Sequence, residues 1–408
     1  MLNRLKNLRT NENVLLAVDT LLHSKATFTN TFLLAFMIRT SLDNSPAEFI
    51  TYKLLCYVGM AALAILLLHF VKKHTLTAWR LGMLFSIVQI IVIITLHTET
   101  TIFPYVLALV TAVESTLYWR PNMFFTISEV RNDRRLRFHS IRQILTESIK
   151  IVMPLVLGLT ITESGYIQSA FIILIISVVQ LLLSVLFRPS HTLNLPTHHP
   201  DVTYRKIINN QSLRRVLYLQ FFRGIVVSGS AFLLIPPILV YQQTGSDLDL
   251  GFYASIGALV SIVIILFFQQ ISHHKRFARV FLWILAPLAV VFSAALTIFP
   301  SHITAIALYI YSVAVIESFF NMFVLGKVQR SLKKQLGGNS FTLEIESISE
   351  VFMCVGRVVS LSALLFVVNT SGATFLPLFA TLSAVLIVPV VIFSHSKKKA
   401  PIEGEIIP

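Results

Sequence analysis

Ionisable and amide side chains stand inside a long hydrophobic run in the first half of the sequence. Glu114, Arg120 and Asn122 lie in the stretch 113–129, within an apolar run that begins near Ile102. An ionisable group inside a bilayer is costly unless it faces protein or water. We therefore treat these three side chains as candidates for a functional site rather than as lipid-facing residues.

A shorter version of this stretch occurs in the second half of the chain. Glu317 is followed by Ser318 and then by the triplet Asn-Met-Phe that begins at Asn321. The same two short motifs, Glu-Ser and Asn-Met-Phe, occur in the first stretch, where they are four residues further apart. The recurrence suggests two related halves that bring such helices together around a polar passage.

The composition is that of a membrane protein. The chain has 408 residues, of which 55% are hydrophobic and 13% charged, and its mean hydropathy is +0.77. A soluble protein carries about twice that charged fraction. The apolar residues form separate, solidly apolar runs of roughly 20 residues, the length of a membrane-spanning helix, whereas barrel strands would alternate.

The sequence predicts an all-α membrane protein with twelve transmembrane helices in two six-helix bundles. At roughly 20 residues per crossing, the spans fall at about 14–39, 50–71, 79–97, 102–125, 142–162, 165–187, 214–242, 250–270, 278–299, 302–326, 344–368 and 371–394. We expect an N-terminal bundle at 1–187, a polar linker at 188–213 and a C-terminal bundle with a short basic tail at 214–408.

The charges of the loops predict the orientation. Net charge is +14, and the loops after even-numbered spans carry the basic residues, for example Lys72, Lys73, Arg131, Arg188, Lys275, Arg330 and Lys397. The loops after odd-numbered spans carry acidic residues instead, although Arg39 and Lys53 flank the first of them. By the positive-inside rule both termini are cytoplasmic. The positive charge then serves orientation and contact with anionic lipid, not nucleic-acid binding.

No metal or cofactor site is expected. Cys56 and Cys354 stand within apolar runs and are interpreted as small buried side chains. The histidines of the linker match no strong ligand spacing. The sequence also contains no phosphate-binding loop of the Gly-x-x-x-x-Gly-Lys-Ser/Thr type.

Corresponding residues of the two halves are separated by a constant number of positions. Glu114 and Glu317 are 317 − 114 = 203 residues apart, and Glu147 and Glu350 are 350 − 147 = 203 apart. Weak internal symmetry of this kind is typical of secondary transporters.

Twelve spans, cytoplasmic termini, a basic central loop and half-chain repetition resemble the major facilitator superfamily over essentially the whole chain. The stretches 29–33, 118–122 and 223–225 are similar to a bacterial branch of it. The loop after span 2, at 69–74, lacks the Gly and Asp that are usual in the family, so the gating salt bridge assigned to that Asp is not carried over.

The resemblance implies two bundles that rock around a site lined by spans 1, 4, 7 and 10 and flanked by spans 2, 5, 8 and 11. The candidate charged and amide residues fall on these spans: Asp19, Lys25, Asn30, Glu114, Arg120, Asn122, Glu147, Lys150, Arg223, Glu317, Asn321, Glu350 and Arg357. Spans 3, 6, 9 and 12 would face lipid.

Two interpretations of these charges remain open. Glu147 and Lys150 are i, i+3 neighbours, and Glu350 and Arg357 are two turns apart, so each couple is able to pair on one helix and close the bundles. Asp19 and Lys25 either join such gating pairs or lie near enough to the cytoplasm to be solvated. The alternative to a functional role is that all these charges neutralise each other.

The residues nearer the bilayer centre favour a role in the cavity. Glu114 and Arg120 are six residues apart, so each needs a partner on another span. A carboxyl group in a low-dielectric site holds a proton more readily than in water, which makes Glu114 and Glu317 candidates for proton coupling. Arg120, Arg223 and Arg357 are candidates for binding an anionic group, with Asn30, Asn122 and Asn321 as further lining residues.

Helix-breaking residues suggest hinges. They are Pro154 and Gly158 in span 5, and Gly224, Gly229, Pro236 and Pro237 in span 7. Close packing of small residues is the alternative interpretation.

The sequence thus predicts a monomeric secondary active transporter of a small solute in the bacterial cytoplasmic membrane, coupled to protons, with efflux favoured over uptake. It predicts no enzymatic activity. The alternative is a polytopic enzyme that modifies a lipid or lipid-linked substrate, for which His139 and the stretch 198–201 form no convincing catalytic group.

Overall fold

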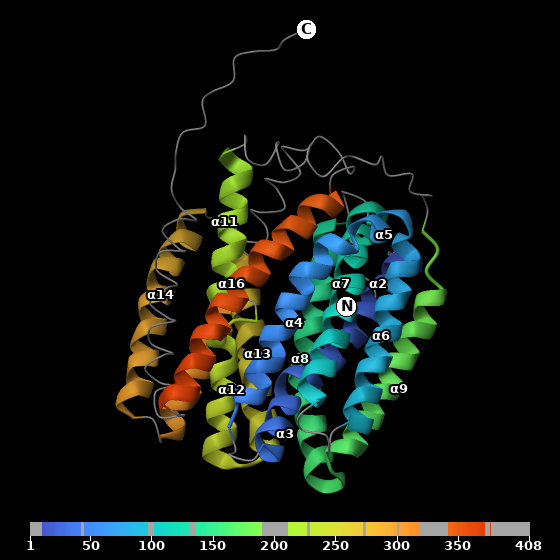
Figure 1. The fold of residues 1–408 in the computed structure, drawn as a ribbon. Helices are drawn as coiled ribbons and strands as arrows, with labels where there is room; N and C mark the ends of the chain where they lie inside the picture. Colours follow the sequence, from blue (N-terminus) through green and yellow to red (C-terminus); the bar gives the residue numbers. More distant parts are fainter. Residues whose placement is uncertain are drawn as a thin grey trace.

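A computed structural model describes residues 10–41, 45–96, 102–130, 135–189, 211–226, 229–271, 275–299, 302–317, 342–371 and 376 (Figure 1). Every regular element in these ranges is helical. Backbone groups in a bilayer have no water to bond, and a helix satisfies them within one segment.

The first half forms six spans, as predicted. Their elements are α2 (Thr10–Thr27), η1 (Phe28–Phe32) and α3 (Leu33–Thr40) for span 1, then α4 (Ala47–Leu66) with α5 (Leu68–Lys73), α6 (Thr75–Leu96), α7 (Phe103–Glu129), α8 (Arg135–Ser164) and α9 (Tyr166–Val185). Span 5 begins seven residues before its predicted start at 142, because α8 opens with a polar, basic turn that hydropathy does not detect.

The described part of the second half corresponds to spans 7 to 11. Its elements are α11 (Gln211–Val226), α12 (Ala231–Thr244), α13 (Asp247–Ile271), α14 (Lys275–Ile298), the helix Ile303–Glu317 and α16 (Thr342–Ser371). The predicted twelfth span, Asn321 and most of the linker lie outside the described residues. Seven helical segments in the described ranges are long and apolar enough to cross a membrane.

Two pairs of helices make the most extensive contacts between the halves. α4 packs along α16, and α8 packs along α13. Figure 1 shows α4 beside α16 near the middle of the molecule, with α6 and α9 toward one edge and α14 at the other. These outer helices expose large apolar side chains, including Ile91, Ile175, Leu182, Ile284 and Val291, as contact with lipid tails requires.

Glycines allow the closest helix contacts. A Cβ atom on Gly224 would lie 2.1 Å from the Met353 carbonyl oxygen, and one on Gly356 would lie 2.1 Å from the Phe221 carbonyl oxygen. α11 and α16 therefore touch backbone to backbone. In the same way Gly158 of α8 faces the Asp247 carbonyl oxygen of α13, at 3.0 Å from a built Cβ.

The expected helix breaks are only partly present. Pro154 lies inside α8, and Pro236 and Pro237 lie inside α12, so none of them ends its helix. Span 7 does divide, because α11 ends at Val226 and α12 begins at Ala231. Gly229, between the two helices, has a φ of 73°, a conformation that glycine adopts without strain.

Replacing Gly356 by Ala should lower the thermal unfolding temperature of the purified protein. The added methyl group has no room against the Phe221 carbonyl, and overpacking typically costs about 1–3 kcal/mol. Gly257→Ala on α13 is the matched control, since its new methyl group meets Ile310 Cγ2 at an ordinary 3.5 Å. Equal unfolding temperatures for the two variants would contradict the close contact of α11 and α16.

Candidate functional site

A buried ion pair links spans 1 and 4 inside the first bundle. Lys25 Nζ lies 2.6 Å from Glu114 Oε1, and the two residues are only 3% and 5% exposed. Lys25 Nζ also donates to Gln89 Oε1 of α6 at 2.7 Å. Glu114 thus has its partner on another span, and Lys25 is not solvated at a membrane surface.

Hydrogen bonds extend this pair toward span 2. Gln89 Nε2 donates to Thr111 Oγ1 at 2.5 Å, and the Tyr52 hydroxyl lies 3.2 Å from the same oxygen. On the same helix as Tyr52, Lys53 Nζ donates to Asn30 Oδ1 at 2.7 Å. The polar groups of four spans therefore form one connected region around Lys25.

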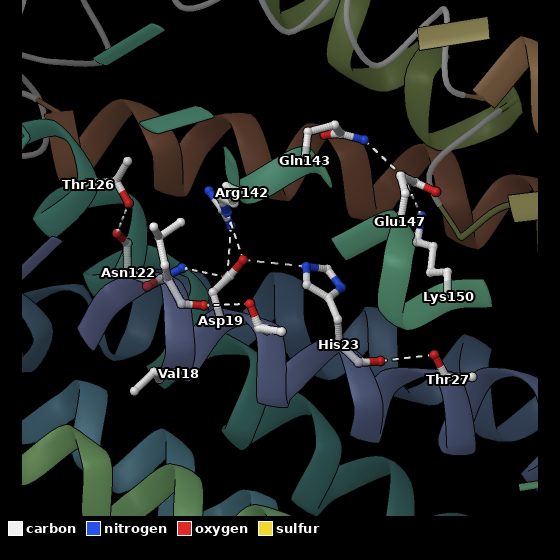
Figure 2. Close-up of polar contacts among 12 residues, drawn as sticks. Val18, Asp19, His23, Thr27, Asn122, Thr126, Arg142, Gln143, Glu147 and Lys150 are labelled. Carbon is white, nitrogen blue, oxygen red and sulfur yellow. Dashed lines mark hydrogen bonds and ion pairs between the residues drawn. The ribbon is translucent and has the colours of Figure 1, made fainter. Parts of the chain in front are cut away.

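A second cluster surrounds Asp19 (Figure 2). Arg142 donates from Nε to Asp19 Oδ2 at 2.7 Å and from Nη2 to Oδ1 at 2.9 Å. Asn122 Nδ2 donates to Oδ1 at 3.2 Å, and His23 Nε2 lies 3.6 Å from Oδ2. Asp19 is 2% exposed, so it holds spans 1, 4 and 5 together and is not solvated. Asn122 contributes to this cluster.

Acidic and basic groups also meet between α8 and the helix Ile303–Glu317. Lys150 Nζ lies 3.2 Å from Glu147 Oε1 on the same helix, and Gln143 Nε2 donates to that oxygen at 2.9 Å. Figure 2 shows these three side chains together. Glu317, from the other half, lies within electrostatic range of Lys150, Glu147 and Arg223.

A further charged region follows the contact of α4 with α16. Arg357 Nη1 lies 3.0 Å from Glu350 Oε1, and the Arg357 guanidinium sits 4.6 Å from the centre of the Tyr57 ring. Arg120 Nη1 donates to the Ala64 carbonyl oxygen at 2.8 Å. Arg223 Nη1 lies 3.4 Å from Gln220 Oε1.

Ion pairs join the halves near both ends of the bundle. Lys72 Nζ of α5 lies 2.5 Å from Glu344 Oε1 of α16. At the other end, Arg39 Nη1 of α3 lies 3.5 Å from Asp247 Oδ2 of α13. The loop after span 2, which lacks the usual family Asp, thus still contributes a charge to a contact between the halves.

Sequence reasoning missed several members of these clusters. Lys53 was interpreted as flanking a loop, but it lies inside α4 and is 7% exposed. Arg142 stands at the predicted beginning of span 5, and Gln89 lies on span 3, which the sequence predicts to face lipid. For Lys53 and Gln89 the available signal was a polar side chain within an apolar run, whereas Arg142 lies in the polar, basic beginning of α8.

No protein-family model and no curated protein matches the chain. Solved structures do match it over nearly its whole length. An auto-inhibited POT family peptide transporter covers 97% of this chain and 99% of its own, with a TM-score of 0.74 and 10% identity. A bacterial homologue of the iron transporter ferroportin, in an outward-facing state, covers 96% and 100%, with a TM-score of 0.67 and 14% identity.

The chain has the major facilitator fold. A POT family transporter in complex with 5-aminolevulinic acid is similar as well, with a TM-score of 0.66 at 12% identity over 94% of this chain and 96% of its own. The major facilitator fold accounts for the two half-to-half contacts, span 2 with span 11 and span 5 with span 8. At these identities the likeness concerns the fold and not the cargo.

Replacing Lys25 by Met, or Glu114 by Gln, should destabilise the protein more than replacing both. Removing one partner leaves a buried charge uncompensated, which costs about 3–5 kcal/mol, whereas an apolar or neutral replacement of the whole pair is often close to neutral. Thermal unfolding of both single variants and of the double variant, in one detergent, measures the coupling. Strictly additive effects would show that the two groups do not depend on each other.

Proposed function

We propose that the protein is a secondary active transporter that moves a small solute by alternating access. The observation that carries the proposal is the distribution of charge: buried ionisable groups follow the contacts between the two halves, and ion pairs join the halves near both ends. Groups so placed become accessible when the halves separate. The transporters of known structure that share the fold support transport over the alternative of a lipid-modifying enzyme.

The two terminal ion pairs are suited to act as gates. Lys72 and Glu344 have side chains that are 10% and 3% exposed, whereas those of Arg39 and Asp247 are 49% and 12% exposed. An exposed ion pair contributes little, while breaking a buried one is costly. The Arg39–Asp247 end is therefore the easier one to open from this conformation.

Glu317 is the best-placed group for proton coupling. It lies within electrostatic range of Lys150, a residue of the other half that also bonds Glu147. When Glu317 takes up a proton, its attraction to Lys150 disappears, and Lys150 remains with Glu147 alone. Protonation would thereby weaken a contact between the halves. Glu114 is a weaker candidate, because Lys25 neutralises it inside one bundle.

The proposal also includes the location of the protein, the direction of transport and the oligomeric state. The basic loops place both termini in the cytoplasm of a bacterium. Efflux is favoured because the spans expected to line the cavity are rich in apolar and aromatic residues. The protein would work as a monomer.

Glu317→Gln should abolish solute movement driven by a pH gradient while leaving solute exchange intact. Proteoliposomes that contain a pH-sensitive dye, challenged with a panel of small solutes under an imposed gradient, report both processes. A neutral amide cannot carry the proton, but it leaves the fold in place. Glu114→Gln tests the second candidate in the same assay.

Glu163→Gln is the matched control, because Glu163 is exposed near the end of α8 and should be dispensable. Full proton-driven flux in the Glu317→Gln and Glu114→Gln double variant would exclude both carboxyl groups as the coupling site. Turnover of a lipid without any flux would instead favour the enzyme.

A further inference from the structure

Arg357, Arg223 and Arg120 differ in the interactions that their guanidinium groups make. The Arg357 guanidinium is bound by Glu350 and stacked on Tyr57. Arg223 interacts with Gln220 on its own helix. Arg120 donates from Nη1 to the Ala64 carbonyl oxygen, but its Nε and Nη2 atoms are buried and have no hydrogen-bond partner.

This open edge of Arg120 is costly as it stands. The residue is 5% exposed, so bulk solvent does not surround these donors. A buried donor without a partner is destabilising, and more so when it is charged. Glu346 and Glu350 of α16 lie within electrostatic range of Arg120, yet neither of them bonds Nε or Nη2.

The chain itself shows what such an edge binds. Arg142 uses the same two atoms, Nε and Nη2, to hold both carboxylate oxygens of Asp19 at 2.7 and 2.9 Å. Parallel N–H groups on this edge of a guanidinium match the two oxygens of a carboxylate or phosphate. In Arg142 the edge is filled by Asp19, whereas in Arg120 it is free.

A second open group stands one turn before Arg120 on α7. The Thr116 hydroxyl is buried and has no hydrogen-bond partner. Other threonines of this helix bond the carbonyl four residues earlier: Thr111 to Leu107 at 2.7 Å, and Thr126 to Asn122 at 2.8 Å. Residues four apart share a face of a helix, so Thr116 and Arg120 present unused donors side by side.

We propose that the transported solute carries an anionic group, a carboxylate or a phosphate, which Arg120 binds through Nε and Nη2 and to which Thr116 donates its hydroxyl. This inference rests on the proposed transport function and names the class of its substrate. Arg120 lies against α4, which meets α16 of the other half. Separation of these helices opens a way to the guanidinium edge.

Matched pairs of small ligands test the proposal on the purified full-length protein. Benzoate and phenyl phosphate are compared with benzamide and benzyl alcohol for their effect on the thermal unfolding temperature, since a ligand of the folded state raises it. The wild type should be stabilised by an anionic probe and not by its neutral counterpart. Arg120→Gln should weaken the binding of that anion roughly tenfold or more, because hydrogen bonds to a charged group are lost.

Two further variants separate recognition from folding. Arg120→Lys keeps the charge but lacks the two parallel N–H donors of the guanidinium. The variant should therefore bind the anion more weakly than the wild type and unfold at a similar temperature. Thr116→Val should weaken binding by less. Arg80→Lys is the control, since Arg80 donates to carbonyls of Ser184 and Phe187, away from the contact between the halves.

A free solute and a lipid headgroup are the two sources of such an anionic group, and mixed micelles distinguish them. Stabilisation by phosphatidylglycerol over phosphatidylcholine, lost in Arg120→Gln, assigns the site to lipid; stabilisation by benzoate or phenyl phosphate assigns it to a solute. Failure of every anion to stabilise the wild type, or equal binding to Arg120→Gln, would overturn the proposal. Proton-driven flux of a neutral solute would also overturn the anion site but would support the proposed transport function. Anion binding without any flux would support the anion site and contradict the transport function.

Discussion

The structure depends on the cost of placing a charge in a bilayer. Lipid tails offer no hydrogen-bond acceptor and no counter-charge, so each ionisable group at that depth needs a partner supplied by the protein. Lys25 and Glu114 meet this requirement between spans 1 and 4, and Asp19 and Arg142 do so between spans 1 and 5. Such pairs fix the rotation of each helix about its axis, which apolar packing against lipid alone would leave undetermined.

Hydropathy was sufficient to predict the helical architecture. Apolar runs identified the spans, and the confinement of charges to certain spans identified the inner helices, because only protein neighbours tolerate them. The partners of those charges were harder to predict. Lys53 and Asn30 are 23 residues apart, and Asp19 and Arg142 are 123 apart. No local pattern relates such residues, since their proximity follows from the register and rotation of packed helices.

Prolines and glycines illustrate the same limit. Pro154 was expected to interrupt span 5, yet α8 continues to Ser164, since a buried helix tolerates a proline when neighbours satisfy the freed carbonyl. Gly158 and Gly224 were ambiguous between hinge and contact, and the carbonyl groups that face them show contact. A proline or glycine indicates that the backbone has a particular role at that position. Whether the role is a hinge or a close helix contact depends on the neighbouring helix.

The internal repeat explains where the acids lie, and departures from it explain what each can do. Glu147 and Glu350 are 203 residues apart on equivalent spans, but one pairs with Lys150 at i+3 and the other with Arg357 at i+7. Glu114 and Glu317 are related by the same spacing, and 203 residues after Lys25 stands Ser228. The second half thus has no lysine at the position that neutralises Glu114. Glu317 instead lies within electrostatic range of Lys150 in the other half, so the two equivalent carboxylates have different surroundings, one paired inside a bundle and the other facing a contact between the halves.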